Sequence, residues 1–147
     1  MGKQATLVDV GVPARILHVS VVTPEATLLE TPAQFVALPL FDGELGVLPG
    51  RSPFIGRLGY GELRVVEGEK NRRYYIDGGF VQVAKNVVSV LTNNAVPAEN
   101  LDAAAAEDEL AAARARLANT PELLEIRSRA QLQARAKIRL ATRRRAR

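Results

Sequence analysis

Residues 80–91 read FVQVAKNVVSVL, and the fold predicted for this chain rests first on their pattern. Apolar and polar residues alternate on both sides of Lys85-Asn86, and alternation at a period of two is typical of strands with one buried face. Two strands separated by two turn-forming residues predict a β-hairpin. Similar short runs rich in β-branched residues occur upstream, at residues 16–23, 27–30, 34–38, 62–66 and 72–76. We therefore predict a β-sandwich or barrel of antiparallel strands over residues 16–95.

Short polar segments separate these runs. Residues 67–70 read Glu-Gly-Glu-Lys, and residues 77–79 read Asp-Gly-Gly. Glycine beside polar residues is a turn signal, so both segments are predicted to be turns. Pro32 lies between the runs at 27–30 and 34–38 and is interpreted as a break between them.

The last third of the sequence is predicted to be helical. Ten of the 21 residues at positions 98–118 are alanine, the strongest helix former, and Asn100 can cap a helix over this segment. Thr120 and Pro121 suit the cap and the first position of a second helix. Because the link between the helices is short, we predict an antiparallel two-helix hairpin over residues 98–147.

One apolar stripe is predicted along the second helix. Its members are spaced by three or four positions: Ile126, Ala130, Ala134, Ile138 and Ala141. The stripe consists mostly of alanine, which buries little apolar surface. The hairpin is therefore predicted to pack only loosely, both on itself and on the β-domain, and to be a mobile element.

The charge of the chain is divided unevenly. Residues 126–147 contain eight arginines, one lysine and no acid, whereas residues 1–125 hold 11 basic and all 16 acidic residues. A basic segment of this kind usually binds nucleic acid, an anionic membrane or an acidic protein surface. We expect the end of this segment, from Arg143 onward, to fray. At the other end, residues 1–15 are predicted to form a flexible leader.

The composition excludes several kinds of site. The chain has no cysteine and a single histidine, His18, which excludes thiolate metal sites and sites with two histidine ligands. The sequence also contains no phosphate-binding loop, nucleophile-elbow or zinc-protease motif. We therefore predict a protein that is not an enzyme and has no metal or cofactor, with His18 on the outer face of a strand.

Residues 38–53, LPLFDGELGVLPGRSP, form an unusual segment in which three glycines and three prolines are interleaved with apolar and acidic residues. One interpretation is a tight turn that supports a strand crossover. The other is a recognition loop, in which glycine and proline set the shape and the acids face a basic or polar partner. The residues alone leave both interpretations open.

The run DGELGVLPG at residues 42–50 resembles the signature loop of the epsilon subunits of F-type (rotary) ATP synthases. Residues 22–25, 78–83 and 87–95 also resemble that family, in the same order along the chain. The resemblance covers nearly the whole chain. It implies an N-terminal β-sandwich of about ten strands, a C-terminal helical hairpin, and a bacterial-type, non-catalytic subunit of the central rotor stalk.

The same resemblance implies a set of partners. The β-domain would bind the gamma subunit and stand on the ring of c subunits, peripheral to the membrane at the cytoplasmic face of the inner membrane. The subunit would couple ion-driven rotation of the c-ring to ATP synthesis by the alpha and beta subunits of the catalytic head. Its helical hairpin would extend along gamma and inhibit ATP hydrolysis.

Individual site residues also follow from the resemblance. The residues that match the segment contacting the c-ring are Phe41, Asp42, Gly43, Glu44 and Leu45. Glu44 is the acid expected to face arginines of the ring, and Arg51 is a further expected contact at a position where the family often has histidine. The basic residues expected to contact an acidic segment of the catalytic beta subunit are Arg127, Arg129, Arg135, Lys137 and Arg139.

The resemblance is incomplete at the nucleotide-binding motif [IL]-D-x-x-R-A of some relatives. Leu101 and Asp102 match the start of this motif, but Ala105 replaces its arginine. Phosphate groups need cationic donors, which Arg129 and Arg135 of the second helix would have to supply. We therefore expect ATP binding to be weak or undetectable.

Two other functions fit parts of the sequence. A nucleic-acid-binding β-domain with a basic helical tail is the alternative, but residues 126–147 contain no aromatic residue for base stacking. A nucleotide sensor without a rotor partner is a third possibility. We favour the rotor-stalk function and expect no nucleic-acid partner.

Overall fold

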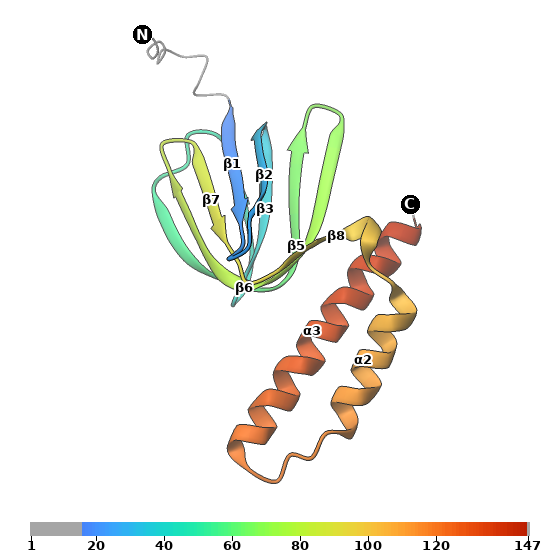
Figure 1. The fold of residues 1–147 in the computed structure, drawn as a ribbon. Helices are drawn as coiled ribbons and strands as arrows, with labels where there is room; N and C mark the ends of the chain where they lie inside the picture. Colours follow the sequence, from blue (N-terminus) through green and yellow to red (C-terminus); the bar gives the residue numbers. More distant parts are fainter. Residues whose placement is uncertain (1–15, 147) are drawn as a thin grey trace.

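The computed structural model describes residues 16–146, so the predicted leader at residues 1–15 lies outside the described residues. The strands are β1 (Leu17–Val22), β2 (Thr27–Ala33), β3 (Phe35–Leu40), β4 (Gly43–Val47), β5 (Phe54–Glu67), β6 (Lys70–Ala84), β7 (Val87–Leu91) and β8 (Ala95–Pro97). A 3-10 helix, η2 (Ala98–Asn100), leads into the helices α2 (Ala103–Ala115) and α3 (Pro121–Ala146). Figure 1 shows the strands gathered into a β-domain and the two helices side by side as a hairpin at one end of it.

The strands pair in the order β2-β1-β7-β6-β5-β3-β4, with β8 paired to β6. All of these pairings are antiparallel except that of β1 with β7, which is parallel. The described residues thus form eight strands, whereas the family resemblance implied about ten. The difference arises because β5 and β6 are continuous over 14 and 15 residues. In β6 the first half pairs with β8 and the second half with β7, so one long strand takes the place of two shorter strands in the count.

The prediction of a turn at residues 77–79 is wrong, because these residues lie inside β6. Gly78 and Gly79 have φ angles of +74° and +113°, a backbone conformation that favours glycine. A Cβ atom on Gly79 would lie 2.0 Å from the carbonyl oxygen of Leu91. The two glycines therefore allow a close strand contact and a local bend, and they do not reverse the chain.

Pro32 does not break the strand either, since β2 continues through it to Ala33. Strand β2 lies at the edge of the sheet, with β1 as its neighbour. Proline is tolerated on an edge strand because its missing N–H costs no ladder hydrogen bond when it faces outward. The predicted turn at residues 67–70 is confirmed, because β5 ends at Glu67 and β6 begins at Lys70.

The hairpin predicted for residues 80–91 is confirmed as the pairing of β6 with β7. Its two turn residues, Lys85 and Asn86, have φ angles of 52° and 65°, as a two-residue turn between twisted strands requires. The alternation is also confirmed: the buried residues include Val81, Val83, Val88 and Val90, whereas Gln82 is exposed. His18 is exposed on β1, as expected.

The predicted pair of helices is present as α2 and α3. Asp102, and not Asn100, caps α2, and its Oδ1 accepts a 3.0 Å hydrogen bond from the backbone N–H of Ala104. Asn100 instead belongs to η2. The cap of α3 is confirmed, because Thr120 Oγ1 accepts a 3.1 Å hydrogen bond from the N–H of Leu123.

The single apolar stripe predicted along α3 is only partly present. Ala134 and Ala141 are buried, but Ile126 is 42% exposed. Ala136 and Leu140, which were not assigned to the stripe, are also buried. The reason is that the second half of α3 packs against both α2 and the β-domain, while its first half extends away from the β-domain (Figure 1).

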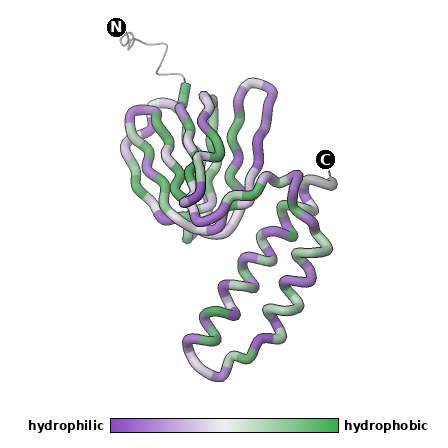
Figure 2. The backbone as a smooth tube through the Cα atoms, in the orientation of Figure 1, coloured by the Kyte–Doolittle hydropathy of each residue, from purple (hydrophilic) through white to green (hydrophobic). Residues whose placement is uncertain are grey.

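Two apolar clusters result from this arrangement. The larger lies inside the β-domain and consists mainly of valine and leucine from β1 and β3–β7. The smaller joins the β-domain to the hairpin through Tyr75, Leu101, Ala136, Leu140 and Ala141. Figure 2 shows hydrophobic residues concentrated in the β-domain and alternating with hydrophilic ones along the hairpin. Within residues 16–146, neither helix has the length and hydropathy that crossing a membrane would require.

Candidate functional site

The unusual segment at residues 38–53 forms the β3–β4 hairpin and the link to β5. Leu40 pairs with Gly43, which leaves Phe41 and Asp42 as the turn. This outcome confirms the interpretation as a tight turn, while the recognition role remains a prediction. Phe41 is 65% exposed, and the guanidinium of Arg57 lies 4.3 Å from the centre of its ring.

The structure brings together five of the six residues expected to contact the c-ring. Asp42, Gly43 and Glu44 are exposed at or beside the turn, and Leu45 is half-buried against the core. Arg51 lies beyond the opposite end of β4, where its guanidinium is 5.5 Å from the ring of Phe54. There the backbone N–H of Gly50 bonds Asn86 Oδ1 at 2.7 Å, which ties this link to the β6–β7 turn.

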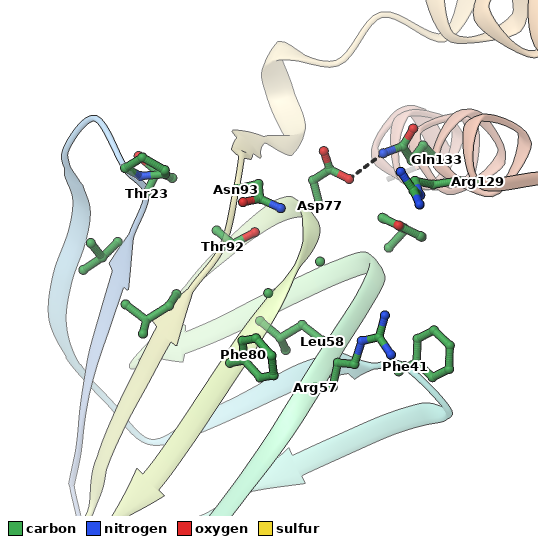
Figure 3. Close-up of a pocket in the computed structure, with 16 residues that line it drawn as sticks. Thr23, Phe41, Arg57, Leu58, Asp77, Phe80, Thr92, Asn93, Arg129 and Gln133 are labelled. Atoms are coloured by element: carbon green, nitrogen blue, oxygen red, sulfur yellow. Dashed lines mark hydrogen bonds between the residues drawn. The ribbon is translucent and has the colours of Figure 1, made fainter. Parts of the chain in front are cut away.

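A groove lies between the end of the β-domain and α3 (Figure 3), and we call it the end groove. Its volume is about 980 Å³, and its lining includes Phe41, Arg57, Tyr60, Asp77, Arg129 and Gln133. Across it, Gln133 Nε2 donates a 2.8 Å hydrogen bond to Asp77 Oδ1. Sequence reasoning missed this contact because Asp77 and Gln133 meet only when the hairpin docks on the β-domain.

Tyr75 lies beneath the docked hairpin. Its hydroxyl donates a 3.4 Å hydrogen bond to Asp77 Oδ1. Burial, together with the neighbouring Asp77 carboxylate, raises the pKa of the Tyr75 hydroxyl far above its ordinary value. Tyr75 therefore remains neutral and serves as a hydrogen-bond donor and an apolar surface for the helix.

The basic residues expected to contact the catalytic beta subunit do not share one environment. Lys137 is engaged within the molecule: its Nζ lies 3.1 Å from Glu109 Oε2 on α2 and 5.4 Å from the centre of the Tyr75 ring. The other four form no ion pair with any side chain that the structure describes: Arg127, Arg129, Arg135 and Arg139. Their charges are thus available to an external acidic surface.

A buried carboxylate anchors the end of α3, contrary to the expectation that Arg143 frays. Glu62 on β5 is 8% exposed, and its Oε1 accepts a 2.7 Å hydrogen bond from Arg143 Nη1. Its Oε2 accepts a hydrogen bond from Nε of Arg73 on β6. We call Glu62, Arg73 and Arg143 the Glu62 cluster.

The residues that match the start of the nucleotide-binding motif have structural roles. Leu101 is buried between the β-domain and the hairpin, and Asp102 is used as the cap of α2. Leu101 packs near Leu140 of α3, and Arg129 lies 11 positions earlier, roughly 16 Å away along a helix that rises 1.5 Å per residue. The structure therefore does not bring Arg129 together with Leu101 and Asp102, and weak ATP binding remains a prediction. Among the described residues, no group of three or more His, Asp or Glu side chains is placed to hold a metal ion.

Comparison with known proteins gives the same architecture. Residues 16–98 match the family described as ATP synthase, Delta/Epsilon chain, beta-sandwich domain. The chain is 51% identical over 119 residues to the ATP synthase epsilon chain of Rhodopirellula baltica, covering 81% of this chain and 93% of that one.

Two solved structures also resemble the chain. A chain of the Euglena gracilis mitochondrial ATP synthase, from a structure of its OSCP/F1/c-ring, has a TM-score of 0.70 and 25% identity, covering 90% of this chain and 81% of that one. A chain from the central stalk/c-ring structure of the Tetrahymena thermophila mitochondrial ATP synthase has a TM-score of 0.69. At 13% identity, with 85% of this chain and 96% of that chain covered, this second likeness shows the fold alone.

The β-sandwich followed by a packed helical pair therefore defines a non-catalytic subunit of the delta/epsilon class of ATP synthases. Within that class, the chain belongs to the family of ATP synthase epsilon chains. The resemblance stated from residues 42–50 and the other matching runs is thereby confirmed.

Proposed function

We propose that this chain is a central-stalk subunit that couples rotation of the c-ring to ATP synthesis and restrains ATP hydrolysis through its helical hairpin. Its partners are the gamma subunit, the c-ring, and the alpha and beta subunits of the catalytic head. Through these partners it lies peripherally at the cytoplasmic face of the inner membrane. Membership of the epsilon-chain family is the observation that carries this proposal.

The coupling role is supported by the β3–β4 turn. This turn projects an exposed aromatic ring, Phe41, and two exposed acids, Asp42 and Glu44, at one point of the β-domain. Strands β3 and β4 hold the turn on both sides, and the backbone N–H of Phe41 bonds the carbonyl oxygen of Arg57 at 2.8 Å. Strands on both sides hold the exposed residues of the turn in a fixed geometry, as a coupling contact requires.

The regulatory role is supported by the way the hairpin docks. Only five buried residues form the apolar cluster between it and the β-domain, and three of these are from α3. Meanwhile four arginines of α3 have no carboxylate partner among the described residues. A weakly docked helix with free positive charge can move to an acidic partner, because several ion pairs acting together offset the lost docking contacts.

Deleting residues 126–147 tests the regulatory role. We expect the truncated chain to assemble into the complex and ATP hydrolysis by that complex to rise. High salt should partly mimic the deletion in the complex with the full chain, since ion pairs at a surface are screened over about 8 Å at physiological ionic strength. Equal rates of hydrolysis with and without the deleted segment, at low and at high salt, would contradict the inhibitory role.

A further inference from the structure

The Glu62 cluster contains the one ion pair between the hairpin and the β-domain within the described residues. The side chain of Glu62 is 6% exposed and that of Arg73 is 9% exposed, whereas that of Arg143 is 50% exposed. Both carboxylate oxygens of Glu62 have a partner, but the two partners come from different parts of the molecule. Arg73 is on the neighbouring strand, and Arg143 is near the end of a helix that docks from outside.

This arrangement makes the Arg143 contact reversible. If α3 left the β-domain, Glu62 would lose one hydrogen bond but would keep the positive charge of Arg73 beside it. A buried charge without any counter-charge is strongly destabilising, and Arg73 prevents that situation. At the Glu62 cluster, releasing the helix therefore costs one charge-assisted hydrogen bond and leaves no buried charge without a counter-charge.

The other polar contacts of α3 differ in kind. Lys137 pairs with Glu109 inside the hairpin, so this ion pair can move with the two helices. Gln133 bonds Asp77 through a neutral amide, which has little attraction for an acidic partner protein. Among the described α3 side chains that bond the β-domain, Arg143 is thus the one whose charge a carboxylate-rich protein surface would also bind.

We propose that Glu62 is an internal competitor for Arg143, occupying in the docked state the arginine that an acidic partner surface binds in the released state. This inference rests on the proposed regulatory function and identifies a residue of the β-domain that sets its strength. Glu62 positions α3 and needs no contact with the catalytic subunits. Weakening its bond to Arg143 shifts the hairpin toward release.

The docking step can be measured on the isolated full-length chain. The sequence contains no cysteine, so cysteines introduced at Glu69 and Ser128, both exposed, can carry a pair of distance probes on the β-domain and on α3. Arg143→Gln and Glu62→Gln should each raise the ratio of released to docked hairpin by roughly tenfold, the factor that corresponds to about 1.4 kcal/mol.

Arg139→Gln is the matched control, because it removes the same charge from an exposed position on the same helix. It should leave the docked fraction unchanged. An equal release by Arg139→Gln and Arg143→Gln would overturn the proposal, since the effect would then come from net charge alone. No release by Arg143→Gln would overturn it as well.

The competition itself is tested in the assembled complex, where variants at the two ends of one ion pair should have unequal effects on ATP hydrolysis. Glu62→Gln frees Arg143 for the acidic partner and should lower ATP hydrolysis below that of the wild type. Arg143→Gln removes the shared arginine and should leave hydrolysis higher than Glu62→Gln does. Equal hydrolysis by the two variants would overturn the competition.

Two controls distinguish misfolding from release of the hairpin, and failure of the regulatory function from failure of the docking contact. Circular dichroism with thermal unfolding shows whether Glu62→Gln still folds, and if it does not, Arg143→Gln against Arg139→Gln decides alone, because Arg143→Gln leaves the pair of Glu62 with Arg73 intact. If the deletion of residues 126–147 has no effect on hydrolysis but Arg143→Gln still releases the hairpin, the regulatory function fails while the docking contact stands.

Discussion

Leu38, Leu63 and Val90 are completely buried in the sandwich, whereas Leu117, Leu124 and Leu132 of the hairpin are 46–69% exposed. The sandwich buries branched apolar side chains, each worth about 1.5–3 kcal/mol when fully removed from water. The buried residues of α2 are two alanines, Ala106 and Ala113, which contribute far less. The two regions of this one chain therefore differ in what keeps them in place: a large core in one, and capping and a few polar contacts in the other.

This difference supports the proposal that one small chain combines a rigid part and a movable part. A region with its own core stays folded whatever its neighbour does, and a region with little core depends on its docking contacts. The expectation that the hairpin packs loosely was drawn from its alanine content, and the exposed leucines agree with it.

Removing the same side chain from each region should have very different consequences. Leu63→Ala should lower the free energy of unfolding of the sandwich by about 2–5 kcal/mol, because it leaves a cavity in a packed core. Leu124→Ala, on the exposed first half of α3, should change it by less than about 0.5 kcal/mol. Chemical denaturation followed by circular dichroism measures both, and similar losses would show that the hairpin shares the core of the sandwich.

Removing the cap of α2 should affect the hairpin alone. Asp102→Ala deletes the acceptor for the N–H of Ala104 and should destabilise the helix by about 1 kcal/mol. Hydrogen exchange should then speed up in α2 and remain unchanged in β5 and β6. Asp108→Ala, an exposed change in the same helix, is the control and should leave both regions as they are. Faster exchange in β5 after loss of the cap would mean that the two regions unfold together.

Changing a charge at the turn of the sandwich should alter function with the smallest effect on stability. Glu44 is exposed, so Glu44→Lys should change the free energy of unfolding by less than about 0.5 kcal/mol. It should nevertheless weaken the coupling of ion flow to ATP synthesis in membrane vesicles, since it reverses the charge proposed to face the c-ring. Glu69→Lys, in another exposed turn of the same domain, should leave coupling intact. A lost β-sheet signal in the Glu44 variant would show a structural role instead.

The parts of this fold that are local in sequence could be predicted. The hairpin around Lys85-Asn86 and the start of α3 at Thr120-Pro121 depend on neighbouring residues only, and both are confirmed. Features that depend on distant residues could not be predicted. Asp77-Gly78-Gly79 has the composition of a turn, yet pairing with β5 and close contact with Leu91 keep it inside a strand.

The residues of the candidate site also fall into two groups, those placed by a local segment and those placed by contacts between distant residues. The exposed turn residues Phe41 to Glu44 were identified from a continuous segment, because the turn is made by that segment itself. Glu62 and Arg143 were not paired in advance, since they are 81 positions apart and meet only through the docking of α3. Nothing in the sequence near Glu62 distinguishes it from the other acids of the β-domain. Its role depends on its burial, which only the packed structure reveals.

The parallel pairing of β1 with β7 has a consequence for synthesis of the chain on the ribosome. Ser20 pairs with Ser89, 69 positions later, so β1 waits for its second neighbour for roughly 3–14 s at 5–20 residues per second. During that time β1 can pair with β2 but presents an open edge on its other side, and unpaired edges template association between chains. In the folded sandwich this edge of β1 is covered by β7. The newly made hairpin of β1 and β2 therefore needs protection from association with other chains until β7 has emerged.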